Sequence, residues 1–147
     1  MAVKEHPIKF HFLKKEFSLS QRRALKEFIL GIAKKHKKAV TEINYIFCDD
    51  DYLLNINQQH LKHDFYTDII TFELSTTAEP IQADIYISID RVKENSQQYN
   101  STFKRELERV IFHGLLHLVG YSDKKKKDQD IMRRKEDELI KLYNRST

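Results

Sequence analysis

The order of hydrophobic periodicities along the 147 residues is the feature that most constrains the fold. Four short segments alternate in the manner of β-strands, and all of them end by residue 89. They have the sequences PIKFHFL, EINYIFC, TDIITFEL and ADIYISI, at residues 7–13, 42–48, 67–74 and 83–89. In the last segment Asp84, Tyr86 and Ser88 alternate with isoleucines, which is typical of a strand.

Helical spacing of apolar residues fills most of the remaining chain. The first predicted helix has its cap at Ser18 or Ser20 and ends near Lys38, and the second, at 50–61, opens with acidic residues that suit a helix N-terminus. Three more helices are predicted at 90–99, 102–119 and 128–143. This pattern predicts an α+β fold, in which about five helices pack on a small mixed four-stranded sheet. Because no repeat or linker interrupts the sequence, we expect residues 1–147 to form a single domain.

Composition excludes several classes of protein. A content of 40% hydrophobic and 33% charged residues is typical of a soluble globular protein, and no apolar run approaches the roughly 20 residues that span a bilayer. The N-terminal residues lack the pattern of a signal peptide, and the one cysteine, Cys48, cannot form an internal disulfide. We therefore expect a cytoplasmic protein that does not contact a membrane.

Charge is segregated along the chain. From Ser20 to Lys38 seven basic residues stand against one acid, whereas from Ala39 to Asp90 ten acids stand against a single base, Lys62. From Lys124 to Arg145 nine basic residues stand against five acids. Such asymmetry predicts a basic side, for which a polyanion is the natural partner. A solvated helix face explains the same pattern equally well, so charge alone only favours nucleic acid.

The stretch HGLLHLVGYSD, residues 113–123, contains the strongest chemical signal. In a helix, residues i and i+4 lie on the same face, so His113 and His117 can direct two imidazole nitrogens at one point. Gly120 follows the last predicted turn, where a left-handed residue ends a helix at little cost, and the reversal brings the carboxylate of Asp123 to the same point. Gly114 is expected to leave room for a substrate or a backbone near the metal. The spacing predicts a metal site with the ligands His113, His117 and Asp123.

Two structural histidines on a core-facing helix are the alternative explanation. An H-x-x-x-H pair arises by chance about 0.3 times in such a chain, but the added Gly at +7 and ligand at +10 reduce the chance to about one in a thousand. Two histidines and a carboxylate leave a coordination position open, as in catalytic zinc sites, where bound water ionises near pH ~7. In peptidases of the H-E-x-x-H type a Glu follows the first His, and here that position is Gly114, which cannot transfer protons.

The stretch resembles the signature H-G-x-L-H-L-x-G-Y-D-H, with a downstream Met, of the YbeY endoribonuclease family, the rRNA maturation factors. It matches at His113, Gly114, Leu116, His117, Leu118, Gly120 and Tyr121, with Met132 at the corresponding distance. Asp123 replaces the family's third histidine, and Ser122 replaces the Asp before it. TDIITF and ADIYIS are similar to the family's T-D-V-L-S-F and G-D-I-x-I-S, and Ile56 and Asn57 stand at its Leu-Asn. The resemblance covers roughly residues 56–132.

The resemblance implies a zincin-like α+β domain that binds one divalent metal ion, usually zinc. It implies a single-strand endoribonuclease acting in 3′-end maturation of small-subunit rRNA and in ribosome quality control, with single-stranded RNA and the small ribosomal subunit as partners. The metal ligands carried over are His113, His117 and, with a changed donor, Asp123, whose oxygen shifts preference toward harder ions such as Mn²⁺. No catalytic residue is assigned beyond the metal-bound water, which either attacks the phosphodiester or deprotonates a ribose 2′-OH.

The family also carries a Y-R-x-K-D segment whose Arg is thought to serve in catalysis. Leu61 stands at that Arg, so either Lys62 contacts the phosphate or the activity is weaker than in the family. The run Lys124, Lys125, Lys126 and Lys127 follows the third ligand and can hold phosphates on a path to the metal, or it is a solvated run. Two further histidines, His60 and His63, either form a second metal or phosphate site or are surface residues.

Three other functions compete with the nuclease. A non-catalytic ribosome-assembly factor would bind rRNA through its basic face and use the metal for structure. A metallopeptidase would need a proton-transferring group that Gly114 does not provide. A non-heme Fe(II) oxygenase also uses two His and a carboxylate, although such sites usually lie on strands rather than on a helix.

Overall fold

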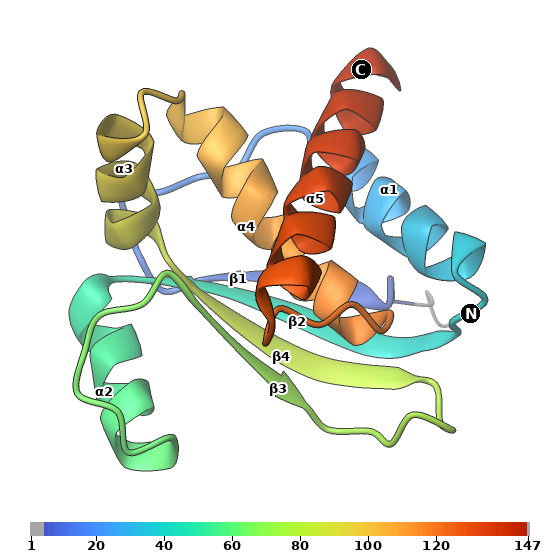
Figure 1. Ribbon diagram of the computed structural model, residues 1–147, viewed down its shortest axis with the longest axis horizontal. Coiled ribbons are helices and arrows are strands. Elements are labelled where there is room, and N and C mark those ends of the chain that lie inside the picture. Colours follow the sequence, from blue (N-terminus) through green and yellow to red (C-terminus); the bar gives the residue numbers. More distant parts are fainter. Residues whose placement is uncertain (1–4, 147) are drawn as a thin grey trace.

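The computed structural model describes residues 5–146, which form one sheet with helices on both of its faces (Figure 1). Within these residues there are four strands, β1 Ile8–Phe12, β2 Val40–Cys48, β3 Ile69–Glu73 and β4 Ile81–Ser88. The helices of the same part of the chain are α1 Arg22–Lys35, α2 Asp50–His60, α3 Ile89–Gln98, α4 Phe103–Leu118 and α5 Lys126–Ser146. The α+β fold predicted from the sequence is confirmed.

The sheet is mixed, with the strand order β1-β2-β4-β3. Strands β1, β2 and β4 are parallel, whereas β3 is antiparallel to β4 and pairs Ile69 with Ile87. The loop between β3 and β4 makes them a hairpin, and this places β3 at the edge of the sheet. The edge strand β3 is also the strand that borders the candidate site described below.

One face of the sheet is covered by α1, α4 and α5, which enclose the larger core (Figure 1). Alternate strand residues point into this core, and they include Ile43, Tyr45, Phe47, Ala83, Ile85 and Ile87. They pack against apolar side chains of α4 such as Ile111 and Leu115, and the hydroxyl of Tyr45 donates to the carbonyl of Ile111 at 3.2 Å. The core therefore fixes the position of α4 over the sheet.

The other face of the sheet is covered only at one end, by α2, where Leu53 packs with Cys48 and Ile70. Beyond α2 this face has a polar layer. The amide of Asn44 donates to Asp84 at 3.0 Å, and Lys9 donates to Glu42 at 2.7 Å. This layer explains why polar residues alternate with isoleucines in the fourth predicted strand.

Two helix starts differ from the sequence prediction. Helix α1 begins after Gln21, whose φ of 54° is left-handed and whose side chain caps nothing, so neither Ser18 nor Ser20 is the cap. The same helix ends at Lys35 rather than near Lys38, because Lys37 has a φ of 60°. Helix α5 begins at Lys126, two residues before the predicted start.

None of the helices in the part of the chain that is described has the length and apolarity to cross a membrane.

Candidate metal centre

Helix α4 places two histidines one turn apart on its face toward β3. The hydroxyl of Thr102 caps the helix by accepting from the backbone N–H of Arg105 at 3.1 Å. The Nε2 atoms of His113 and His117 lie 3.1 Å apart, and their ring centroids lie 4.6 Å apart. The predicted convergence of the two imidazoles on one point is confirmed.

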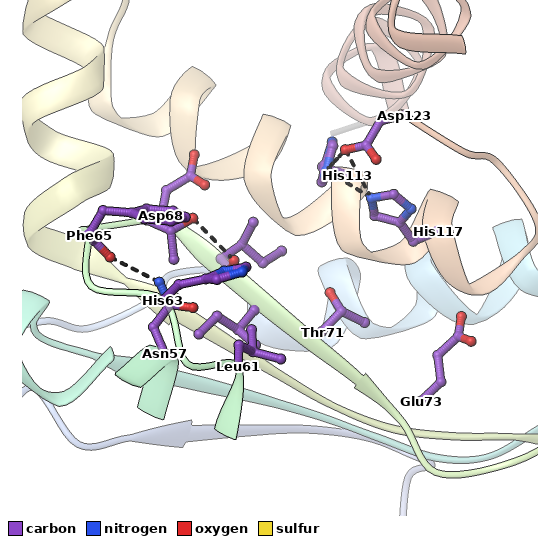
Figure 2. Close-up of a pocket in the computed structure, with 13 residues that line it drawn as sticks. Asn57, Leu61, His63, Phe65, Asp68, Thr71, Glu73, His113, His117 and Asp123 are labelled. Carbon is purple, nitrogen blue, oxygen red and sulfur yellow. Dashed lines mark hydrogen bonds and ion pairs between the residues drawn. The ribbon is translucent and has the colours of Figure 1, made fainter. Parts of the chain in front are cut away.

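The chain turns back at Gly120 and brings a carboxylate to the same point. Gly120 has a φ of +112°, which L side chains rarely adopt, and the N–H of Tyr121 donates to the carbonyl of Leu116 at 2.9 Å. The Oδ2 atom of Asp123 then lies 3.5 Å from Nε2 of His113 and 3.4 Å from Nε2 of His117 (Figure 2). One ligand atom from each of the three residues lies within 4.8 Å of the others.

The outer nitrogens of both histidines are committed to hydrogen bonds. Nδ1 of His117 lies 3.0 Å from the carbonyl oxygen of Tyr121, which can only accept, so this Nδ1 carries the proton. Nδ1 of His113 lies 2.7 Å from Oε2 of Glu136 and donates to that carboxylate. In the neutral imidazoles, which are the form that binds a metal, both Nε2 atoms are therefore left with lone pairs that face each other and Asp123.

This arrangement of donors fits a divalent cation. Two nitrogen lone pairs 3.1 Å apart, beside a carboxylate oxygen, repel one another unless a positive charge lies among them. Ligand atoms about 2.0–2.1 Å from a tetrahedral zinc lie roughly 3.4 Å from one another. The three distances here, 3.1, 3.4 and 3.5 Å, match that spacing. Three protein ligands leave a coordination position open, as in catalytic sites.

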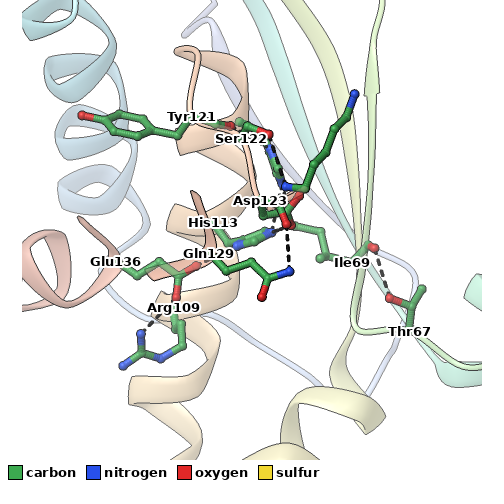
Figure 3. Close-up of polar contacts among 11 residues, drawn as sticks. Thr67, Ile69, Arg109, His113, Tyr121, Ser122, Asp123, Gln129 and Glu136 are labelled. Carbon is green, nitrogen blue, oxygen red and sulfur yellow. Dashed lines mark hydrogen bonds and ion pairs between the residues drawn. The ribbon is translucent and has the colours of Figure 1, made fainter. Parts of the chain in front are cut away.

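A buried ion pair lies behind His113. Glu136 of α5 is 4% exposed, and its Oε1 accepts from Arg109 at 3.0 Å while Oε2 accepts from His113 (Figure 3). Arg109 also donates to Asp137 at 2.6 Å. Burial lowers the pKa of His113, but the hydrogen bond and charge of Glu136 outweigh burial and raise that pKa above its ordinary value. Glu136 was not predicted from the sequence, which singled out only Met132, one turn earlier on α5.

Met132 is a core residue, 2% exposed, and it lies beside the site rather than apart from it. It lines a pocket of about 330 Å³ together with His113, Asp123 and Glu136. The main-chain carbonyl of Asp123 accepts from Gln129 of α5 at 3.1 Å (Figure 3). Helix α5 therefore supports both the candidate ligand His113 and the loop that carries Asp123.

Of the two roles expected for Gly114, room for a substrate or for a neighbouring backbone, the structure supports the second. A Cβ atom at this position would lie 3.1 Å from Cδ1 of Ile69 and 3.1 Å from Cδ1 of Ile85. The glycine therefore allows α4 to approach strands β3 and β4 closely, and it does not make room for a substrate. A proton-transferring side chain at this position would point into the core.

A larger pocket, of about 650 Å³, opens beside the three ligand residues between α4, β3 and the loop from α2 to β3 (Figure 2). Its lining residues are Asn57, Leu61, His63, Phe65, Thr67, Asp68, Ile69, Ile70, Thr71, Glu73, His113, His117 and Asp123. Asp68 borders both pockets, and burial raises the pKa of its carboxyl. Its Oδ2 accepts from Asn95 at 3.4 Å, and its carbonyl accepts from the N–H of Ser88 at 2.9 Å.

The five lysines expected to hold phosphates do not line this pocket. Lys62 and Lys124 to Lys127 are all exposed, and Lys126 pairs with Asp130 at 3.2 Å. Leu61, at the position of the family's Arg, is the C-cap of α2 and forms part of the pocket wall, 42% exposed. Among the described residues that line the larger pocket, there is no Lys or Arg.

Comparison with known proteins identifies the family. The pattern of the family described as endoribonuclease YbeY matches residues 8–144. The chain is 50% identical over 140 residues to endoribonuclease YbeY of Cytophaga hutchinsonii, covering 95% of this chain and 98% of that protein. It is 46% identical to endoribonuclease YbeY of Flavobacterium psychrophilum, covering 88% of this chain and 91% of that one.

The solved structures agree with these sequence matches. The solution structure of TM1509 from Thermotoga maritima superposes with a TM-score of 0.64 at 28% identity, covering 92% of this chain and 88% of that one. A family pattern that extends over nearly the whole chain, two relatives matched over at least 91% of their lengths and a shared fold lead to one assignment. The chain belongs to the endoribonuclease YbeY family.

Proposed function

We propose that this protein is a metal-dependent endoribonuclease that cleaves single-stranded RNA. His113, His117 and Asp123 hold one divalent metal ion, with Zn²⁺ the best fit to the donor set. The observation that carries the proposal is the convergence of two Nε2 atoms and a carboxylate at 3.1–3.5 Å, each imidazole ring fixed by a hydrogen bond behind it. Family membership supplies the substrate class, because the curated relatives are endoribonucleases.

A bound divalent ion supplies Lewis-acid chemistry, because it polarises a phosphoryl oxygen and lowers the pKa of bound water. The chain supplies the positioning. The carbonyl of Tyr121 and the carboxylate of Glu136 fix the orientation of the two imidazole rings, so that little reorganisation accompanies binding. A pocket of about 650 Å³ is of the size that holds small ligands, so RNA enters it only as an unpaired strand.

The cellular role follows from the family resemblance. We infer that the substrate is the 3′ region of small-subunit rRNA and that the protein meets the small ribosomal subunit in the cytoplasm. Lys62 and the run Lys124 to Lys127 are proposed as phosphate contacts outside the pocket, where exposed ammonium groups bind backbone phosphates without reading sequence.

The test measures metal content and cleavage of single-stranded RNA for the wild type and for His117→Ala. We expect about one equivalent of metal in the wild type and the loss of both metal and cleavage in the variant, because two ligands hold zinc poorly. His11→Ala is the matched control, since His11 is an exposed histidine that contacts Asn44 on the other face of the sheet. A wild type that binds no metal contradicts the proposal.

A second candidate function is a non-catalytic ribosome-assembly factor with a structural metal. The observation that favours it is Leu61, which puts an apolar side chain in the pocket wall where the family pattern has an Arg. Metal bound by the wild type but lost in His117→Ala, with no cleavage by either protein, would support this function instead. A peptidase is disfavoured, because Gly114 provides no proton-transferring side chain and an added Cβ there would meet Ile69 and Ile85 at 3.1 Å.

A further inference from the structure

The loop between α2 and β3 exposes an unusual amount of apolar surface beside the metal ligands. Leu61, Phe65 and Tyr66 are 42%, 56% and 49% exposed. The rings of His63 and Phe65 stack, with centroids 5.1 Å apart and an interplanar angle of 20°. His63 and Phe65 line the larger pocket, and Figure 2 shows them on the side opposite His113, His117 and Asp123.

The loop is held in this conformation from behind. Asn57 is 1% exposed, and its side-chain amide donates to the carbonyl of Phe65 at 2.9 Å. The carbonyl of Asn57 accepts from the N–H of His63 at 3.1 Å, and Lys62 between them has a left-handed φ of 57°. The amide of Gln58 donates to Asp64 at 2.6 Å. A strained turn clamped by a buried amide keeps the two rings in place before any ligand arrives.

His63 and Phe65 form the wall of the larger pocket opposite the candidate metal ligands, and the chemistry of this wall determines which kind of group fits it. The wall carries no Lys or Arg among its described residues, so it is not built for a phosphate. It offers a pair of stacked aromatic rings, and the flat partner available in a single RNA strand is the nucleobase. We propose that His63 and Phe65 form a stacking platform for an unpaired nucleobase whose phosphate lies at the metal. This inference rests on the proposed function and names where the substrate's base is held.

Tryptophan fluorescence can test this proposal, because the chain contains no tryptophan of its own. Phe65→Trp therefore places a single tryptophan on the platform, and its fluorescence can be excited selectively over that of the seven tyrosines. The metal-loaded variant is titrated with a short 2′-O-methyl adenine oligonucleotide and with an abasic ribose-phosphate oligomer of the same length. We expect saturable quenching of Trp fluorescence by the adenine oligonucleotide and none by the abasic oligomer. Quenching by both oligomers alike, or by neither, overturns the proposal.

Leu13→Trp is the matched control. Leu13 is 51% exposed, close to the exposure of Phe65, and it follows β1 at the opposite edge of the sheet from β3. We expect no quenching in this variant at the same oligonucleotide concentrations. Quenching equal to that of Phe65→Trp would mean that RNA does not select the platform, and the proposal would be wrong.

Affinity provides an independent readout. Phe65→Ala is expected to bind the adenine oligonucleotide about ten-fold or more weakly, because stacking of one base is lost, and Phe65→Tyr to retain wild-type affinity. The fold is expected to survive, since the side chain is mostly exposed, and circular dichroism checks this. Equal affinity of Phe65→Ala and wild type refutes the platform.

The two proposals can fail separately. If the adenine oligonucleotide quenches Phe65→Trp but wild type never cuts RNA, the platform stands and the endoribonuclease proposal falls. If wild type cuts RNA and Phe65→Ala cuts it with an unchanged KM, the endoribonuclease proposal stands and the platform falls.

Discussion

At the scale of single residues, Glu136 links the candidate metal site to the core. Its two oxygens accept from His113 and Arg109, so a buried carboxylate both orients a ligand ring and neutralises a buried guanidinium. The pKa of Arg109 is raised, because its hydrogen bonds to Asp137 and Glu136 outweigh the opposing effect of burial. A carboxylate that accepts a hydrogen bond from a metal-ligating histidine fixes the orientation of the ring and makes its other nitrogen a better metal ligand.

We predict that Glu136→Gln weakens zinc binding by about 10–100-fold, because the amide no longer matches the Nδ1 donor of His113 with a negative charge. Competition with a chelating dye measures the change. Glu138→Gln is the control, since it makes the same chemical change on the same helix at an exposed residue paired with Lys135 at 3.2 Å. Equal zinc affinity in the two variants would show that Glu136 serves only the ion pair with Arg109.

The sequence pointed to the three candidate ligands but not to the residues that hold them in place, because only the candidate ligands are close together in the sequence. His113 and His117 are one helical turn apart, and Asp123 follows a glycine turn, so a local pattern is enough to bring them together. Glu136 meets His113 across 23 residues through the packing of α5 on α4, which no local periodicity encodes. His63 and Phe65 lie on a loop whose shape depends on the buried amide of Asn57.

At the scale of elements, two glycines in helices have opposite environments. Gly31 lies on the exposed side of α1, where an added Cβ meets nothing within 4 Å. Gly114 lies on the buried side of α4, where an added Cβ meets Ile69 and Ile85 at 3.1 Å. Sequence alone makes the two positions equivalent, because each is a glycine inside a predicted helix.

We predict that Gly114→Glu lowers the free energy of unfolding by about 3 kcal/mol or more, because it overpacks the core and buries an unpaired carboxylate. Gly31→Glu, the same change at the open position, is expected to stabilise the protein by about 0.5–1 kcal/mol through helix propensity. Urea denaturation of both variants measures the difference. Similar unfolding midpoints would mean that α4 does not pack on β3 and β4 as described.

Elements were easier to predict than their ends and partners. Every predicted strand and helix has a counterpart in the described residues, because alternation and helical spacing are strong over these segments. The start of α1 was missed because the left-handed Gln21 provides no capping side chain to detect. The antiparallel placement of β3 depends on its hairpin with β4 and not on its own pattern, and this placement makes β3 the edge of the pocket.

At the scale of the whole molecule, a bound metal would cross-link helix α4 to the loop before α5. His113 and His117 lie on α4, Asp123 lies on the loop before α5, and Glu136 ties α5 to the same point. An unfolded chain cannot hold these groups together, so metal binding adds to the free energy of folding. The metal centre is therefore expected to act as a structural clamp as well as a chemical site.

We predict that removing the metal lowers the melting temperature. At free zinc about 100-fold above the Kd, binding stabilises the folded state by about 2.7 kcal/mol, which corresponds to roughly 5–10 °C in a chain of this length. Differential scanning calorimetry of the zinc-loaded protein, with and without a chelator, measures the shift. His117→Ala should melt at the same temperature in both conditions, because it lacks the second imidazole ligand. A wild type whose melting temperature is unaffected by the chelator would show that the three side chains do not hold a metal.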